Sequence, residues 1–528
     1  MLDILIINGT IIDGSGTPAY KGCVGIKDGK FVAAKETSPA AQIIDARGKV
    51  VCPGFIDAHS HGDKIVGTED GRLFKTTQGV TTELAGNCGS MRAPIAPEYR
   101  ELICNHYKIL QPTEEVSKWS VFENYLRYVE EQKLSANVRF YVGHNILRMS
   151  AMGLENRPAG AKELDNMSAM LREAMESGAA GLSTGLIYIP GCFSQPEEVR
   201  TLAKVIAPFD GIYCSHMRNE SYALAQSVQE VLDVGIAAGV RLNISHFKVM
   251  GKPNWGNHQR CLDMMQKAND EGIHTTCDQY PYTRCMTSLS ACMPPWYFSK
   301  SKEEVAQQLR DPELRKKIRK EMEDPATDYD NFYLNSGGWG GVLISVASKV
   351  KEAEGLTVEE YARKLGTDPW TAFFDLMVKD DCRSDAVYSA MRDEDLCDII
   401  RAPFCVVGSD GYTLDWNGMG HPRASASFPQ AIDYFVKEKG ILSLEEMIRK
   451  MTGLTADRLQ VANKGYIREG YDADLLILDY DNLKVRSTYT EPNRKTEGID
   501  YVIVGGKTVY KELEFTGNYS GKVIRYNR

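Results

Sequence analysis

The residue types best suited to chemistry in this 528-residue chain are histidines that stand where predicted strands end. Because His59 and His61 are two residues apart on a strand, both imidazoles point to the same side, and such a pair can chelate a metal ion. A hydrogen-bonded histidine of the core would explain any one of these positions, but it explains a set at matching strand ends poorly. The set predicted to face a metal site is His59, His61, His216 and His246.

A carboxylate ends the last predicted strand of the same series. Asp410 closes the run VVGSDG, so its side chain is expected at the same edge as the histidines. There it could bind the water on a metal ion and accept its proton. The alternative is a turn cap, since Asp-Gly is a common turn pair. The position at a strand end favours the catalytic role. His144 also follows a predicted strand, and it could orient a loop or a substrate.

The elements that would position these side chains alternate regularly. Apolar strand-like runs are separated by helix-length amphipathic segments, an order that predicts a parallel sheet. Eight such units are the number in a (β/α)8 barrel, where catalytic side chains gather at the carboxyl ends of the strands. An open doubly wound sheet is the alternative. The runs are 50–61, 80–89, 137–145, 179–188, 211–217, 241–248, 273–282 and 402–410.

The two ends of the chain resemble each other and differ from the middle. Residues 1–55 and 465–528 consist of short apolar runs broken by turns, such as the hairpin signal Asp28-Gly29. We predict that they form one small β-sandwich domain, into which a barrel spanning 56–464 is inserted. About 120 residues separate the last two predicted barrel strands, too many for one crossover. Part of this stretch, 285–345, is predicted to be an inserted subdomain.

Composition places the chain among ordinary globular proteins. Apolar residues make up 43% and charged residues 25%, and the net charge of −9 without a basic block argues against nucleic-acid binding. We find no stretch of 18 apolar residues that would span a membrane and no signal-peptide pattern at the N-terminus. Thirteen scattered cysteines indicate reduced thiols and a cytoplasmic protein. The oligomeric state is not predicted.

Taken together, the motifs resemble one family over nearly the whole chain. PGFIDAHSH, GNCG, CSHMRNE, ISHFK, GLSTGL, DQYPY, GSDG and GHPR are similar to the D-aminoacylase (N-acyl-D-amino-acid deacylase) family of the amidohydrolase superfamily. The resemblance implies an α/β protein with a TIM-like barrel. It also implies zinc-dependent hydrolysis of the amide bond of small N-acyl-D-amino acids, which gives a carboxylate and a free D-amino acid.

The resemblance also implies roles for individual residues. Asp410 would be the catalytic acid and base. Cys88, His216 and His246 would hold a tightly bound zinc, and His59 and His61 would hold a second, weaker metal ion that Cys88 bridges. A thiolate is a strong zinc ligand, although Cys88 could also be one more buried thiol. Arg423 and Lys248 would grip the substrate carboxylate. The further substrate contacts that the family implies are Tyr188 and either Tyr280 or Tyr282.

Two departures from related patterns bear on the function. Many amidohydrolases bridge two metal ions with a carboxylated lysine at the fourth strand, but this chain reads GLSTGLIY there, with no lysine. The family often shows HTHDD where this chain has HSHGD, which still keeps the second carboxylate. Alternatives are a cyclic-amide hydrolase like the hydantoinases, a D-dipeptide hydrolase of the same superfamily, and a catalytically silent metal-binding scaffold. The missing lysine and the cysteine of GNCG weaken the hydantoinase alternative.

Overall fold

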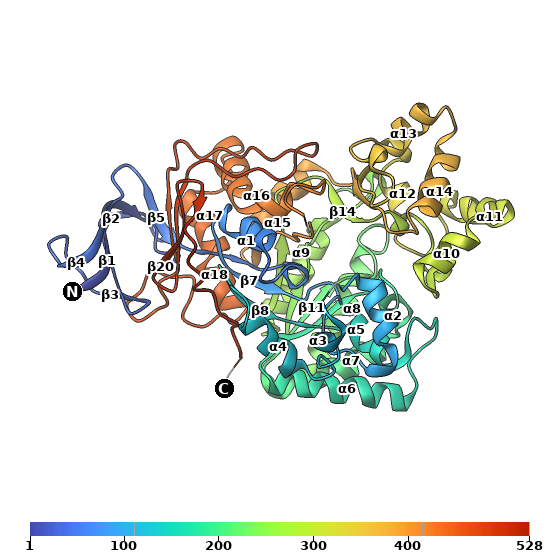
Figure 1. Ribbon diagram of the computed structural model, residues 1–528, viewed down its shortest axis with the longest axis horizontal. Coiled ribbons are helices and arrows are strands. Elements are labelled where there is room, and N and C mark those ends of the chain that lie inside the picture. Colours follow the sequence, from blue (N-terminus) through green and yellow to red (C-terminus); the bar gives the residue numbers. More distant parts are fainter. Residues whose placement is uncertain (110, 414, 527–528) are drawn as a thin grey trace.

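A computed structural model describes residues 1–109, 111–413 and 415–526. Three regions follow one another along its longest axis (Figure 1). A β-rich region contains the N-terminus and strands from both ends of the chain, and a region of parallel strands and helices occupies the middle. The last described residues, 521–526, lie against this middle region, and a smaller mixed unit lies at the far end. No helix among the described residues combines the length and the apolar character that crossing a membrane requires.

Strands from both ends of the chain pair in one nine-stranded sheet. Its C-terminal strand β18 is antiparallel to the N-terminal β5, with Leu475 opposite Pro53. The predicted turn at Asp28 and Gly29 joins β2 to β3, and both residues have the positive φ that a two-residue hairpin requires. Across the sheet the strands are β21 (Glu514–Phe515), β20 (Lys507–Lys511), β19 (Ile499–Val504), β18 (Leu475–Leu478), β5 (Val50–Pro53), β1 (Leu2–Ile11), β2 (Tyr20–Lys27) and β3 (Lys30–Val32), with β4 (Ala40–Asp45) beside β1.

Each of the eight predicted runs contains a strand that pairs in parallel with its neighbours, so the mixed α/β class is confirmed. The first sheet consists of β6 (Phe55–Asp57), β7 (Val80–Ala85) and β8 (Asn137–Phe140). The second has the order β17 (Cys405–Val407), β13 (Thr275–Gln279), β12 (Arg241–Ile244), β11 (Ile212–His216), β10 (Gly181–Gly185) and β9 (Val142–Gly143).

Two short junctions connect these sheets. On one side, only Tyr141 separates β8 from β9, so a single chain segment contributes to both. On the other side, the segment after β6 reaches β17 through backbone hydrogen bonds. Ala58 donates to the carbonyl of Val407 (3.3 Å), and Asp410 donates to that of His59 (2.8 Å). The carboxyl ends of all these strands therefore face one common region.

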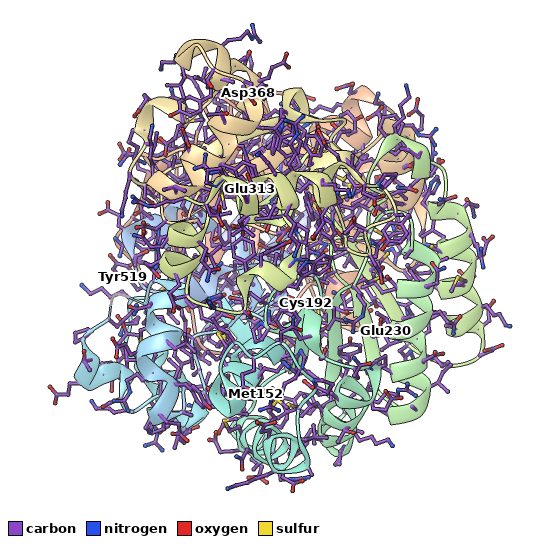
Figure 2. The ribbon with its side chains drawn as sticks, turned by 90° about the vertical axis from the view of Figure 1, so that its right-hand side faces the viewer. Met152, Cys192, Glu230, Glu313, Asp368 and Tyr519 are labelled. Carbon is purple, nitrogen blue, oxygen red and sulfur yellow. The ribbon has the colours of Figure 1, made fainter. Side chains whose placement is uncertain are left out.

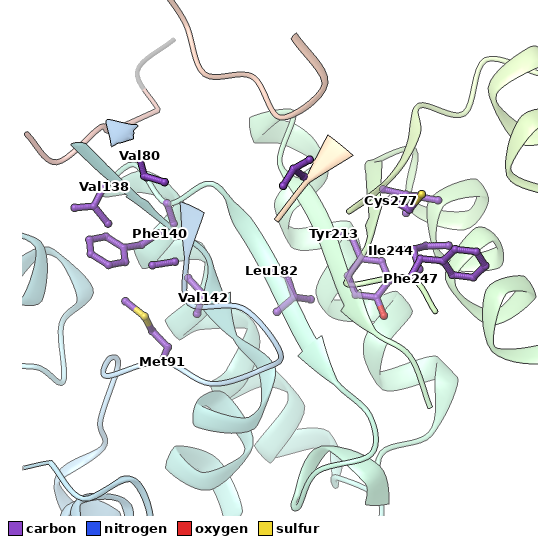
Figure 3. Close-up of a cluster of buried hydrophobic side chains, with 14 of the residues drawn as sticks. Val80, Met91, Val138, Phe140, Val142, Leu182, Tyr213, Ile244, Phe247 and Cys277 are labelled. Atoms are coloured by element: carbon purple, nitrogen blue, oxygen red, sulfur yellow. The ribbon is translucent and has the colours of Figure 1, made fainter. Parts of the chain in front are cut away.

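Helices surround the parallel strands, and the apolar side chains between them form the largest core. Figure 3 shows Val142, Leu182 and Ile244, from β9, β10 and β12, in this cluster. The helices are α1 (Glu69–Thr76), α2 (Arg100–Tyr107), α3 (Thr113–Val116), α4 (Phe122–Glu130), α5 (His144–Met152), α6 (Ala161–Glu176), α7 (Pro196–Ile206), α8 (Leu224–Ala238), α9 (His258–Asp270), α15 (Asp393–Arg401), α16 (Arg423–Ala431), α17 (Leu444–Met451) and α18 (Gly453–Arg458).

The chain between β13 and α15 forms the mixed unit, which has a core of its own around Trp339, Trp370 and Phe373. Its sheet is antiparallel, and β16 lies between β14 and β15, so the unit continues beyond residue 345. In the view of Figure 2, Glu313 and Asp368 of this unit lie above Cys192 and Glu230 of the parallel-strand region. Its elements are β14 (Cys285–Ser288), β15 (Val342–Val346), β16 (Asp385–Tyr388), α10 (Lys302–Gln308), α11 (Pro312–Glu323), α12 (Phe332–Asn335), α13 (Val358–Leu365) and α14 (Pro369–Lys379).

Candidate active site

Six of the residues singled out in the sequence converge at the carboxyl ends of the parallel strands. They form two overlapping groups, within each of which the potential ligand atoms all lie within 4.8 Å of one another. Cys88 belongs to both groups: its Sγ lies 3.3 Å from His59 Nε2 and 3.4 Å from His246 Nε2. The first group is His59, His61, Cys88 and Asp410, and the second is Cys88, His216 and His246.

Sharp turns after the strands aim several of these side chains into the site. Cys88 follows β7, His246 follows β12 and Asp410 follows β17. All three have a positive φ (54°, 35° and 48°), a conformation that non-glycine residues seldom adopt and that costs roughly 1–3 kcal/mol. Strain of this kind persists where the surrounding structure enforces it, and it gathers at functional sites. The backbone geometry therefore marks the same place as the side-chain chemistry.

Two buried carboxylates orient the histidines that face Cys88. Asp278 Oδ1 lies 3.2 Å from His59 Nδ1 and also accepts the backbone N–H of His246 (2.8 Å). Glu220 Oε1 lies 3.1 Å from His246 Nδ1. With Nδ1 occupied in this way, the Nε2 atom of each ring is left to face Cys88, as metal-binding histidines require. Sequence reasoning did not identify either carboxylate, although they stand inside the quoted motifs DQYPY and CSHMRNE.

The buried donor set suits a metal cation. Among the described residues, neither ring nitrogen of His216 has a hydrogen-bond partner, nor does Nδ1 of His61. Burial lowers the pKa of His61 to about 3 and that of His216 well below its ordinary value, so both rings are neutral, as ligands must be. Burial also raises the pKa of the Cys88 thiol, so a thiolate here needs a cation beside it. The residues present therefore fit a metal ion.

Asp410 is placed to take part in proton transfer beside this cluster. Its Oδ1 lies 3.1 Å from His61 Nε2, and its Oδ2 lies 2.9 Å from an Arg423 guanidinium nitrogen. Burial alone would raise the pKa of this carboxyl, but the positive charge of Arg423 and the hydrogen bond with His61 hold it well below its ordinary value. The Asp410 carboxyl is therefore ionised and has the charge state in which a carboxylate can accept a proton.

Comparisons with known proteins agree with this geometry. Residues 42–510 match the amidohydrolase family. The N-acyl-D-glutamate deacylase of Alcaligenes xylosoxydans xylosoxydans is 32% identical over 99% of this chain and 96% of its own. The D-aminoacylase of the same organism is 30% identical, covering 99% and 97%. A crystal structure of N-acyl-D-glutamate deacylase from Bordetella bronchiseptica, complexed with zinc and a phosphonate inhibitor, has a TM-score of 0.83 at 30% identity and covers 99% of each chain.

The chain belongs to the D-aminoacylase family of amidohydrolases. The resemblance drawn from the motifs is confirmed, and so is the expectation of a hydrolase that acts on linear N-acyl amides. In this amidohydrolase, the cluster centred on Cys88 is the candidate metal site.

The amidohydrolase has a cavity of about 790 Å³ beside the cluster. Cys88, Asp410 and Arg423 line it, and Tyr188 contributes its ring, which packs on His216 with 5.0 Å between centroids. The mixed unit supplies the opposite wall through residues such as Thr287, whose hydroxyl is 2.9 Å from that of Tyr188. A bound molecule would therefore lie between the parallel-strand region and the mixed unit.

The other predicted substrate contacts differ in how close they lie to the charged groups of the site. Lys248 is buried against Glu220, with Nζ 2.7 and 2.8 Å from the two carboxylate oxygens, so its charge is paired within the protein. The ring of Tyr280 lies 4.8 Å from the Arg423 guanidinium. Tyr282 packs instead on His421, with 5.1 Å between ring centroids. Tyr280 is thus nearer than Tyr282 to the charged groups of the site.

His144, for which the sequence left two readings open, lies apart from the metal ligands in a buried ion-pair network. Its Nε2 is 2.7 Å from Glu198, whose other oxygen accepts from Arg148 at 2.5 Å. This network joins α5 to α7. The structure therefore gives His144 a packing and electrostatic role between two helices.

Proposed function

We propose that this amidohydrolase uses zinc to hydrolyse the amide bond of N-acyl-D-amino acids. The observation that carries the proposal is the cluster itself: Cys88 lies within reach of two histidine pairs, beside the ionised Asp410. The relatives that match over 99% of the chain are named as N-acyl-D-glutamate deacylase and D-aminoacylase, and the solved relative contains zinc. The products would be a carboxylate and a free D-amino acid.

We assign one tight zinc to Cys88, His216 and His246, and a weaker metal ion to His59 and His61 with Cys88 as the bridge. A thiolate with imidazole nitrogens is a preferred zinc donor set, and a catalytic zinc keeps one position open. When bound, zinc polarises a carbonyl and makes a water molecule more acidic. Asp278 and Glu220 keep the histidine rings in the orientation and tautomer that ligation needs.

Side chains of the protein would carry out proton transfer and hold the substrate. Asp410 would accept the proton of the attacking water and then return it to the nitrogen of the leaving amino acid. Arg423 lines the cavity next to Asp410, and a guanidinium can hold a carboxylate with two hydrogen bonds. It would fix the α-carboxylate, with Lys248 adding positive charge behind it. Tyr188, Tyr280 and Tyr282 would shape the pocket around that group.

The fold proposal follows the strand pairing. We propose that the parallel strands form a (β/α)8 barrel in which β8 and β9 together make one of the eight strands, supported by the junctions at Tyr141 and between Ala58 and Val407. The terminal segments 1–55 and 465–528 would form the β-sandwich domain around the barrel of 56–464. The inserted unit would begin near 285 and extend beyond 345, as β16 requires. A cytoplasmic location is supported by thirteen free thiols.

A panel of paired enantiomers tests the proposal. Zinc-loaded protein is offered N-acetyl-D- and N-acetyl-L-amino acids, a D-dipeptide and a hydantoin, and the release of amine or acid is measured. We expect turnover of the linear N-acetyl-D-amino acids in clear preference to their L-enantiomers. Preference for the hydantoin or the dipeptide would favour those alternatives, and no turnover of any compound would favour a silent metal-binding scaffold.

A further inference from the structure

One buried carboxylate of the mixed unit reaches the loop that carries Glu220. Asp330 lies between α11 and α12, and it is 5% exposed. The loop follows β11 of the parallel-strand region, where Glu220 comes four residues after the proposed ligand His216. Asp330 and Glu220 are 110 residues apart in the chain. Their contact therefore joins two separate parts of the fold.

Both oxygens of Asp330 accept hydrogen bonds. Oδ2 accepts the backbone N–H of Glu220 (2.8 Å), and Oδ1 accepts the hydroxyl of Ser221 (2.7 Å). Oδ1 also accepts a side-chain N–H of Asn335, which belongs to the mixed unit itself (2.8 Å). Burial raises the pKa of Asp330 to about 6, so the carboxyl is mainly ionised at neutral pH and can accept all three hydrogen bonds. These contacts fix the loop to the mixed unit.

The backbone of Glu220 is held on both sides. Its N–H donates to Asp330, and its carbonyl accepts the backbone N–H of Met250 (2.8 Å), in the segment that follows β12. Its carboxylate lies 3.1 Å from His246 Nδ1 and pairs with Lys248. Because a side chain has few favourable rotamers once its backbone is fixed, the hydrogen bond to the Glu220 N–H also limits where this carboxylate lies.

A second hydrogen bond crosses the same interface at the surface. The hydroxyl of Tyr222 donates to Asp328 Oδ1 (2.7 Å), and both residues are exposed. Each stands two residues from a partner of the buried contact, since Tyr222 follows Glu220 and Asp328 precedes Asp330. This hydrogen bond joins two side chains, so it connects the two parts of the fold without holding the Glu220 backbone.

We propose that Asp330 is a positioning residue of the metal site. By holding the backbone of Glu220, the mixed unit keeps the His246 ring in the orientation that binds zinc. Docking of the mixed unit and zinc affinity are therefore coupled. Such coupling is reciprocal, so bound zinc should also stabilise the contact of Asp330 with the loop. The inference rests on the proposed function, since it concerns the zinc site assigned there.

Two substitutions of Asp330 isolate its hydrogen bond to Glu220. Asp330→Asn and Asp330→Ala both remove the charge, but only asparagine keeps an oxygen that can accept the Glu220 N–H. The zinc dissociation constant of metal-free protein is measured by competition with a chromophoric chelator. We expect it to rise roughly tenfold in the alanine variant, the lower end of the range for residues that orient a metal ligand, and to stay within about threefold of the wild type in the asparagine variant.

Tyr222→Phe is the matched control, because it removes the hydrogen bond to Asp328 and leaves that of Asp330 with Glu220 in place. Its zinc affinity should stay within twofold of the wild type. Thermal unfolding establishes that each variant is folded. A folded alanine variant with wild-type zinc affinity overturns the inference. Equal losses in the alanine variant and the control, or in the two Asp330 variants, also overturn it.

Hydrogen exchange on the unsubstituted protein tests the coupling even if the alanine variant fails to fold. Zinc should slow the exchange of backbone amides in 219–223 and also in 328–335 of the mixed unit, but not in α13 of the same unit. Exchange in 328–335 that is equal with and without zinc overturns the inference. If zinc binds as expected but no N-acyl-D-amino acid is hydrolysed, the coupling stands and the proposed function is overturned.

Discussion

We expect the carboxylate of Glu220 to determine which ring nitrogen of His246 carries the proton, and therefore whether Nε2 can bind a metal ion. Nδ1 of His246 has two neighbours, Glu220 Oε1 at 3.1 Å and Lys248 Nζ at 2.7 Å. When Nδ1 donates to Glu220, Nε2 keeps its lone pair and can bind metal. When Lys248 donates to Nδ1, the ring proton must sit on Nε2, which then cannot bind. Glu220 also holds Lys248 through two contacts of 2.7 and 2.8 Å.

Glu220→Gln removes the acceptor charge and leaves both buried partners in place. The Lys248 ammonium then loses its counter-charge next to His246, so the ring tautomer shifts away from ligation. Loss of a partner that orients a metal ligand typically lowers metal affinity by 10- to 100-fold, which corresponds to about 1.4–2.8 kcal/mol. We expect the zinc dissociation constant of the variant to rise by that factor.

Competition with a chromophoric chelator measures this constant on metal-free protein. Glu230→Gln is the control, since Glu230 pairs with Arg218 in the same cavity at 2.9 Å and contacts no proposed ligand. A zinc affinity within twofold of the wild type in the Glu220 variant would refute the argument from tautomers. A loss equal to that of the control would mean that the effect is a general one of cavity charge.

Three further outcomes are expected. Asp410→Asn should retain zinc but lose about 100- to 10,000-fold in kcat, because an amide cannot accept the proton of water; near-normal turnover would remove Asp410 from the mechanism. Arg423→Ala should lower kcat/KM by about 100-fold for an N-acyl-D-amino acid and much less for its amide, and equal losses would indicate a structural role. Against the effect of burial, His144 and Arg148 hold the pKa of Glu198 near 2, below its ordinary 4.5, so this stabilisation exists above pH 4.5 and is lost as the pH falls towards 2. The destabilisation caused by Glu198→Gln, seen in thermal unfolding, should therefore shrink between pH 7 and pH 3, and a pH-independent difference would contradict it.

The site was largely predictable because strand order determines where side chains gather. Parallel strands end at the same edge, so residues at their carboxyl ends must lie close together whatever the details of packing. This is why His59, Cys88, His216 and Asp410 could be grouped from positions far apart in the sequence, and the structure brings them within 4.8 Å in two overlapping sets. The terminal strands could be predicted from composition, since both ends of the chain consist of short apolar runs separated by glycines.

The features that could not be predicted are contacts between distant residues, because such contacts leave no periodic pattern in the sequence. Glu220 follows its strand in an irregular segment, and nothing in its spacing shows that it meets His246. No sequence pattern predicts the ion pair of Arg423 with Asp410 either, although this pair helps to keep the Asp410 carboxylate ionised. The position of β16 between β14 and β15 pairs residues as far apart in the chain as Cys285 and Tyr388. Such pairings are set by tertiary packing and not by local pattern.

A zinc titration of metal-free protein tests the central claim most directly. Protein stripped with a chelator is mixed with increasing zinc, and the release of D-amino acid from its N-acetyl derivative is followed. The account predicts negligible turnover without metal, and activity that rises and reaches its maximum near one zinc per chain, where Cys88, His216 and His246 are filled. Full activity in the metal-free protein would contradict it, as would an inactive protein that binds one zinc tightly.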